Sequence, residues 1–156
     1  MPRVRVIGCG NPDAGDDAAG LTAVERARPL LRADVEVVTA PTGSQVLDLL
    51  DDADAVLLVD AMRTADRSRD AGALIRVEAG PDGLPVDLRS SLSSHGLGLA
   101  EAVGIASALG TLPRIVFLGI EVADVVAGAG LSPAVAAAIP DLVDAIVLES
   151  SGGSDP

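Results

Sequence analysis

Three side chains that could bind a metal ion lie at the ends of three separate hydrophobic segments of this 156-residue chain. They are Asp17, Asp60 and His95, and His95 is the only histidine in the sequence. Two carboxylates and an imidazole suit a borderline divalent cation. Three protein ligands would leave other coordination positions of the ion open, either for water or for a partner that already holds the metal. The sequence therefore indicates a metal site, provided that the fold brings the three segments to one edge of a sheet.

The loop that contains Asp17 follows a strand-like run from Val4 to Cys9 and holds two adjacent acids. Asp16 is expected to cap the helix that follows, because a carboxylate at a helix N-terminus accepts its free N–H groups and favours its dipole. One acid is enough for a cap. Asp17 is therefore the acid that remains for a functional role.

Asp60 and His95 each have a structural alternative. Asp60 closes the apolar run Ala55 to Val59, and the carboxyl end of a parallel strand is where α/β folds bind ligands. A solvated aspartate at the start of a loop is the other interpretation. Serines and glycines flank His95, which weakens the case for a core histidine, although many loop histidines are inert.

Two other kinds of site fit the sequence less well. Gly8 and Gly10 follow a strand and precede a helix, as in a dinucleotide fingerprint, but Asp13 stands where a third glycine is needed. The acids of this loop would also repel a pyrophosphate. A serine hydrolase of the nucleophile-elbow type needs Gly-x-Ser-x-Gly, which the sequence lacks, so Ser93 or Ser94 with His95 makes a weak catalytic pair.

The composition limits the partners. Twenty-three acids against 11 bases, all arginine, give a formal net charge of −12, which repels phosphate backbones and anionic membranes. Nucleic acid and membranes are therefore not expected partners. The acidic surface could suit a basic or metal-bearing partner, or serve solubility alone. The N-terminus passes directly into a strand pattern without a signal peptide, so a cytoplasmic location is expected.

The core must be almost entirely aliphatic, since Phe117 is the only aromatic residue. Cys9 is the only cysteine, which excludes an intramolecular disulfide, and it is expected to pack as a small apolar residue.

Alternating strand and helix patterns predict a three-layer α/β/α sandwich around a mostly parallel five-stranded twisted sheet. The stretch 60–95 shows one strand and no helix, which leaves room for an antiparallel strand there. Residues 1–149 are expected to form a single domain, and residues 150–156 a disordered tail. The expected strands are 4–9, 35–39, 55–59, 73–77 and 114–120, and the expected helices are 16–31, 42–50, 98–109 and 132–148.

Several motifs in this order resemble the hydrogenase maturation proteases, over nearly the whole chain. The similar segments are Val6-Ile7-Gly8-Cys9-Gly10-Asn11 with Asp16-Asp17 and Gly20, Val59-Asp60-Ala61, Ser94-His95-Gly96-Leu97-Gly98-Leu99, Leu118-Gly119-Ile120-Glu121 and Gly130-Leu131-Ser132-Pro133-Ala134-Val135. One departure is Ala18-Ala19, where the family often has a glycine after the two acids. Alanine suits a helical turn, so the local geometry should survive.

The resemblance implies a nickel-dependent endopeptidase that removes the C-terminal extension of a [NiFe]-hydrogenase large-subunit precursor after metal insertion. Asp17, Asp60 and His95 are implied as the metal ligands and catalytic residues, and the precursor is expected to supply the nickel. Glu121 could orient water or the peptide. The protein is expected to be a monomer. The alternatives are a non-catalytic nickel-sensing checkpoint protein and a nucleotide-binding α/β domain.

Overall fold

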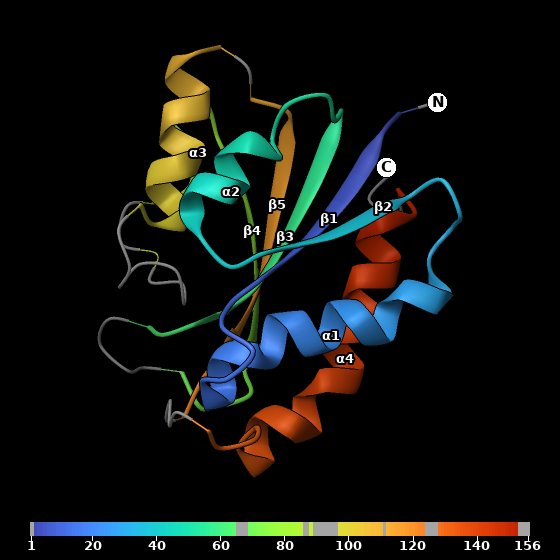
Figure 1. Cartoon of the computed structure of the whole chain (residues 1–156), viewed down its shortest axis with the longest axis vertical. Coiled ribbons are helices and arrows are strands. Elements are labelled where there is room, and N and C mark those ends of the chain that lie inside the picture. The colour runs from blue at the N-terminus through green and yellow to red at the C-terminus, as the bar shows by residue number, and fades with distance from the viewer. Residues whose placement is uncertain are drawn as a thin grey trace.

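The computed structural model describes residues 2–64, 69–85, 88, 97–110, 112–123 and 128–152. Its centre is a five-stranded sheet in the order β2-β1-β3-β5-β4 (Figure 1). The first four of these strands are parallel, and β4 pairs antiparallel with β5. The strands are β1 (Val4–Cys9), β2 (Glu36–Ala40), β3 (Ala55–Met62), β4 (Leu74–Glu78) and β5 (Arg114–Glu121).

Helices cover both faces of the sheet, which confirms the predicted three-layer fold (Figure 1). One face carries α1 (Ala19–Ala27) and α4 (Pro133–Ser150), and the other carries α2 (Gly43–Asp48) and α3 (Leu99–Ala108). Short 3-10 helices precede and follow α1, namely η1 (Gly15–Ala18) and η2 (Arg28–Leu30). The helix predicted over 16–31 is therefore three consecutive helical segments.

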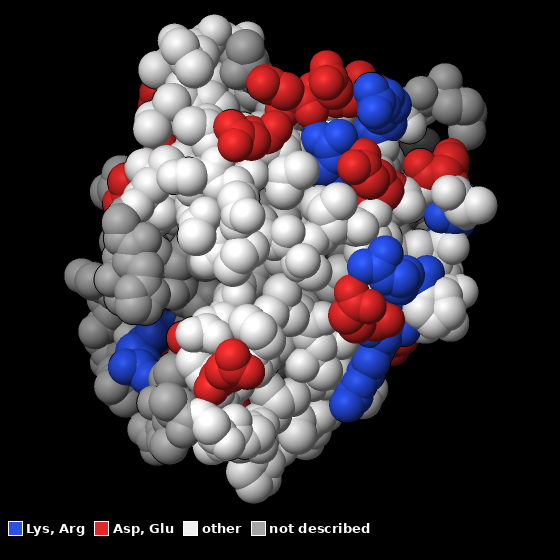
Figure 2. All heavy atoms as spheres, in the orientation of Figure 1, with Lys and Arg blue, Asp and Glu red and all other residues white. Residues whose placement is uncertain are grey.

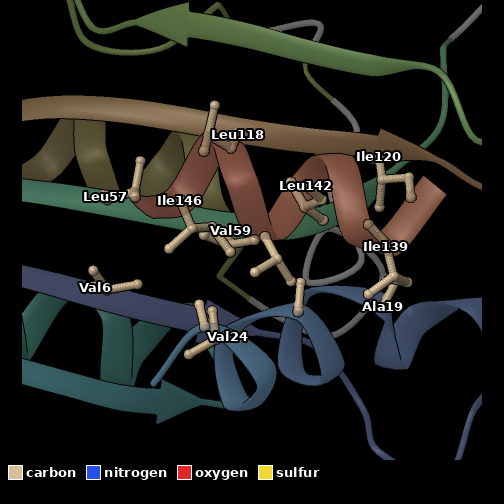
Figure 3. Close-up of a cluster of buried hydrophobic side chains, with 14 of the residues drawn as sticks. Val6, Ala19, Val24, Leu57, Val59, Leu118, Ile120, Ile139, Leu142 and Ile146 are labelled. Carbon is tan, nitrogen blue, oxygen red and sulfur yellow. The ribbon is translucent and has the colours of Figure 1, made fainter. Parts of the chain in front are cut away.

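Aliphatic side chains fill the space between the sheet and the pair α1 and α4 (Figure 3). Val6, Val59 and Leu118, from three neighbouring strands, lie in one cluster with Val24 of α1 and with Ile139 and Ile146 of α4. Alternate residues of the same strands face α2 and α3, where Phe117 is fully buried. Both faces of the central strands are thus apolar, as expected for a parallel sheet between two helical layers.

Local sequence signals explain where two helices begin. Thr42 caps α2, because its hydroxyl accepts a hydrogen bond of 3.2 Å from the Gln45 amide. Pro133 opens α4, as predicted, since the first turn of a helix needs no N–H group from that position. This helix continues through Pro140 to Ser150. The predicted tail therefore starts too early at position 150, and residues 153–156 lie outside the described part.

Charged side chains lie mainly toward the margins of the face shown in Figure 2, around a broad uncharged centre. Arginines there lie beside acids. Ion pairs on this chain include Arg5 with Glu36 at 2.9 Å and Arg28 with Glu25 at 2.8 Å. Such pairs neutralise arginines locally and leave the acidic excess as the dominant charge. No helix among the described residues is both long and apolar enough to cross a membrane.

Candidate active site

Asp60 lies inside β3, near the carboxyl ends of the parallel strands. The strand continues to Met62, so the prediction that Asp60 follows the strand is wrong by two residues. The pairing of β1 with β3 extends only to Gly8 opposite Val59, whereas Asp60 still pairs with Gly119 of β5. Asp60 therefore lies where the sheet loses one neighbouring strand, and its side chain is completely buried.

Strand alternation gives the direction of the Asp60 side chain. Leu58 and Met62, two positions to either side, pack in the cluster beneath α2 and α3. Successive side chains of a strand point to opposite faces, so Asp60 faces the same layer as these two residues. It is a carboxylate in an otherwise apolar row.

Cys9 lies beside this carboxylate, on the same face of the sheet. Burial of the Cys9 thiol raises its pKa well above the ordinary value, and the negative charge of Asp60 raises the pKa further. The thiol is fully buried, which confirms that Cys9 packs as a small apolar residue. Because the Cys9 thiol keeps its proton, it adds no second negative charge beside Asp60.

Asp17 lies on η1, directly before α1, and is partly exposed. Gly20, three residues later, lies against Val59 and Asp60 of β3: a Cβ at this position would come within 2.5 Å of the Val59 carbonyl oxygen and 2.9 Å of the Asp60 Cα. The start of α1 therefore lies against β3, and Asp17, on the helical segment directly before it, lies at the carboxyl edge of the sheet.

His95 lies outside the described residues, but the segment that follows it is described. A Cβ on Gly43 would clash with the carbonyl oxygen of Leu97, so Leu97 lies against the first residue of α2. Because α2 follows the carboxyl end of β2, Leu97 is at the same edge of the sheet as Asp17 and Asp60. Within the described residues, no three His, Cys, Asp or Glu side chains form a metal-binding group, and the proposed trio includes a residue beyond them.

Asp16 does not cap a helix, so the role predicted for it is wrong. Neither η1 nor α1 has a side-chain cap. The Asp16 carboxylate is fully buried and accepts three hydrogen bonds from the chain that follows β5: from the amide of Ala123, and from the amide and hydroxyl of Ser132. These partners are more than 100 residues away in the sequence, so no local pattern could have indicated them.

Glu121, the last residue of β5, is also buried, and its carboxylate is hydrogen-bonded to Thr64. Its two carboxylate oxygens accept hydrogen bonds from the Thr64 amide at 3.1 and 2.9 Å, and one of them also accepts from the Thr64 hydroxyl. The side chain thus ties the segment after β3 to the end of β5. The structure gives Glu121 this structural contact, and a role in orienting water or peptide stays a prediction.

Comparisons with known proteins agree with this fold. The hydrogenase maturation protease (HycI) family model matches residues 24–149. The solved structure of the hydrogenase maturating endopeptidase HybD from E. coli has a TM-score of 0.78 and 24% identity, over 96% of this chain and 94% of that one. The hydrogenase 2 maturation peptidase from Thaumarchaeota archaeon SCGC_AB-539-E09 has a TM-score of 0.68 and 25% identity, over 96% and 98% of the two chains. The comparison with curated proteins found no match.

The fold and the family match together define a hydrolase of the protease class. The chain belongs to the hydrogenase maturation protease family, as its motifs had indicated.

Proposed function

We propose that this protein removes the C-terminal extension of a [NiFe]-hydrogenase large-subunit precursor after nickel has been inserted. Family membership supports the class of reaction. The main structural support for the site is Asp60, a completely buried carboxylate in an apolar strand. It lies where β1 stops pairing with β3 and where Gly20 of α1 packs closely against β3. A carboxylate in such surroundings favours a cation as a partner.

In this proposal the nickel ion belongs to the substrate. Asp17, Asp60 and His95 would complete the coordination of an ion that the precursor already holds. A precursor without nickel offers no ion for these three ligands to share, so the enzyme would bind the metal-loaded form more tightly. The affinity difference would make cleavage depend on completed metal insertion.

The chemistry of cleavage would come from the same contact. A divalent ion at the scissile peptide can polarise the carbonyl group or activate a water molecule. The residues of this chain would hold the ion and the peptide in register at the carboxyl edge of the sheet. We further propose that the protein acts as a cytoplasmic monomer, with the precursor as its macromolecular partner.

The direct test compares nickel-loaded and nickel-free precursor as substrates. Each is incubated with the protein, and the mass of its C-terminus is measured. We expect a terminal peptide to be released only from the nickel-loaded form. Tight binding of the nickel-loaded precursor with an intact terminus would instead identify a checkpoint protein that senses the ion without cutting. Equal cleavage of both forms would contradict the role of nickel.

A further inference from the structure

We infer that Asp16 is a positioning residue: its buried carboxylate anchors η1 and thereby sets the position of the Asp17 carboxylate. The inference rests on the proposed function of Asp17. It assigns the two adjacent acids different roles, one directed into the protein and one toward the candidate site. Asp16 is 0% exposed, whereas Asp17 is partly exposed.

The anchor consists of three hydrogen bonds that converge on one carboxylate. Oδ1 accepts from the Ser132 amide at 2.7 Å, and Oδ2 accepts from the Ser132 hydroxyl at 2.8 Å and from the Ala123 amide at 3.1 Å. All three partners are donors, which an ionised carboxylate satisfies and a neutral side chain satisfies less well. Ser132 is also the residue before α4, so the anchor joins η1 to the start of that helix.

The segment needs such an anchor because η1 is too short to hold itself. It has four residues, its N-cap residue Ala14 provides no side-chain cap, and its first residue, Gly15, has a positive φ of 57°. Short 3-10 helices have poor internal hydrogen bonds. One further tie to the same region is the hydrogen bond of 2.8 Å from the Gly128 amide to the Asp13 carbonyl. The contacts of Asp16 and Asp13 therefore fix the backbone on which Asp17 stands.

The same contacts place the residues after β5 beside the candidate site. Ala123 follows the end of β5 by two residues, and Ser132 precedes α4 by one. Through Asp16, these two points and the loop after β1 form one connected unit at the carboxyl edge of the sheet. A change in the Asp16 carboxylate should therefore move Asp17 without touching Asp60 directly.

The test measures kcat/KM for the nickel-loaded precursor in a double-mutant cycle. Asp17→Glu keeps a carboxylate but shifts it by one methylene, so it serves as the background in which Asp17 is already misplaced. We expect Asp16→Asn to lower kcat/KM by at least about tenfold in the native protein and by less than about threefold in the Asp17→Glu background, since residues that act through one another are not additive. A merely structural role would give equal factors in both backgrounds.

Two controls separate this effect from a loss of stability and from failure of the proposed function. Ile146→Val removes a buried methylene from α4 and should leave kcat/KM unchanged below the unfolding transition. Ser132→Ala removes one of the three hydrogen bonds and should have an intermediate effect. Equal factors in the two backgrounds, or full activity of Asp16→Asn, would overturn the inference while wild-type cleavage upholds the proposed function. Failure of the wild-type protein to cleave would instead reject the proposed function.

Discussion

Gly20 of α1 lies directly against Asp60 of β3, with no room for a side chain between them. A Cβ on Gly20 would lie 2.5 Å from the Val59 carbonyl oxygen, 2.9 Å from the Asp60 Cα and 2.9 Å from the Cys9 carbonyl oxygen. All three are backbone atoms, which cannot rotate away as a flexible side chain can. The start of α1, and with it Asp17, is thus held against the strand that carries Asp60.

Gly20→Ala should therefore both destabilise the protein and impair cleavage. We expect the free energy of unfolding to fall by about 1–3 kcal/mol, the usual effect of forcing an extra methyl group into a packed interior. Cleavage should fall because α1 must shift away from Asp60. The matched control is Gly104→Ala in α3, where a Cβ meets no atom within 4 Å. That variant should gain up to about 1 kcal/mol from its better helix propensity and keep its activity.

The site assignment predicts that Asp17→Ala, Asp60→Ala and His95→Ala each abolish processing while the protein remains folded. We expect losses of at least about 100-fold, since even the outer hydrogen-bond partners of metal ligands are worth roughly 10- to 100-fold. Mass analysis of the precursor and thermal unfolding measure the two effects. Asp13→Ala, which removes an exposed carboxylate from the same loop, is the control. Unchanged cleavage by any two of the three variants would defeat the assignment.

The raised pKa of Cys9 predicts a loss of stability at alkaline pH. Unfolding exposes the thiol, which then ionises near its ordinary pKa of about 8.5, whereas the folded thiol keeps its proton. Above that pH the unfolded state binds fewer protons than the folded state, so stability falls as pH rises, by up to about 1.4 kcal/mol per pH unit. This contribution is complete below the unfolded pKa and is lost as pH rises toward the folded pKa.

The composition of the chain allows this pH dependence to be assigned to a single side chain. The sequence contains no tyrosine and no lysine, so Cys9 is the only side chain that should titrate between pH 9 and 11 in urea unfolding experiments. The Cys9→Ala variant should show no such slope. A wild-type protein with the same pH dependence as Cys9→Ala would contradict the burial of the thiol beside Asp60.

Glu121 and Thr64 should affect stability more than catalysis. Glu121→Gln replaces one carboxylate oxygen with an NH2 group, so at least one Thr64 donor would face another donor. This should lower the free energy of unfolding by about 1–3 kcal/mol. Thr64→Val removes the hydroxyl alone and should cost less. In both variants we expect the cleavage rate to follow the fraction of folded protein. A loss of cleavage in Glu121→Gln that Thr64→Val does not share would instead support a role for Glu121 in orienting water or peptide.

Local pattern was sufficient for the architecture. Continuous apolar runs such as Ala55 to Val59 predict buried parallel strands, and the helix-free stretch after Asp60 correctly left room for the antiparallel strand β4. Errors in the expected elements are at their ends, as for β3, which runs past Asp60 to Met62 because pairing with β5 continues there. Sequence periodicity cannot show where a neighbouring strand stops.

The two adjacent acids show the limit of sequence analysis most clearly. From the sequence, Asp16 and Asp17 differ only by one position in a helix start, and a cap is the natural local role for the first. The structure buries Asp16 because Ala123 and Ser132, more than 100 residues further along the chain, direct three donors at it. The types and order of the candidate ligands were thus determined by the sequence itself. That Asp16 is buried on three hydrogen bonds while Asp17 stays partly exposed was decided only by tertiary contacts, since hydrogen-bond partners so far apart in the chain leave no periodic signal.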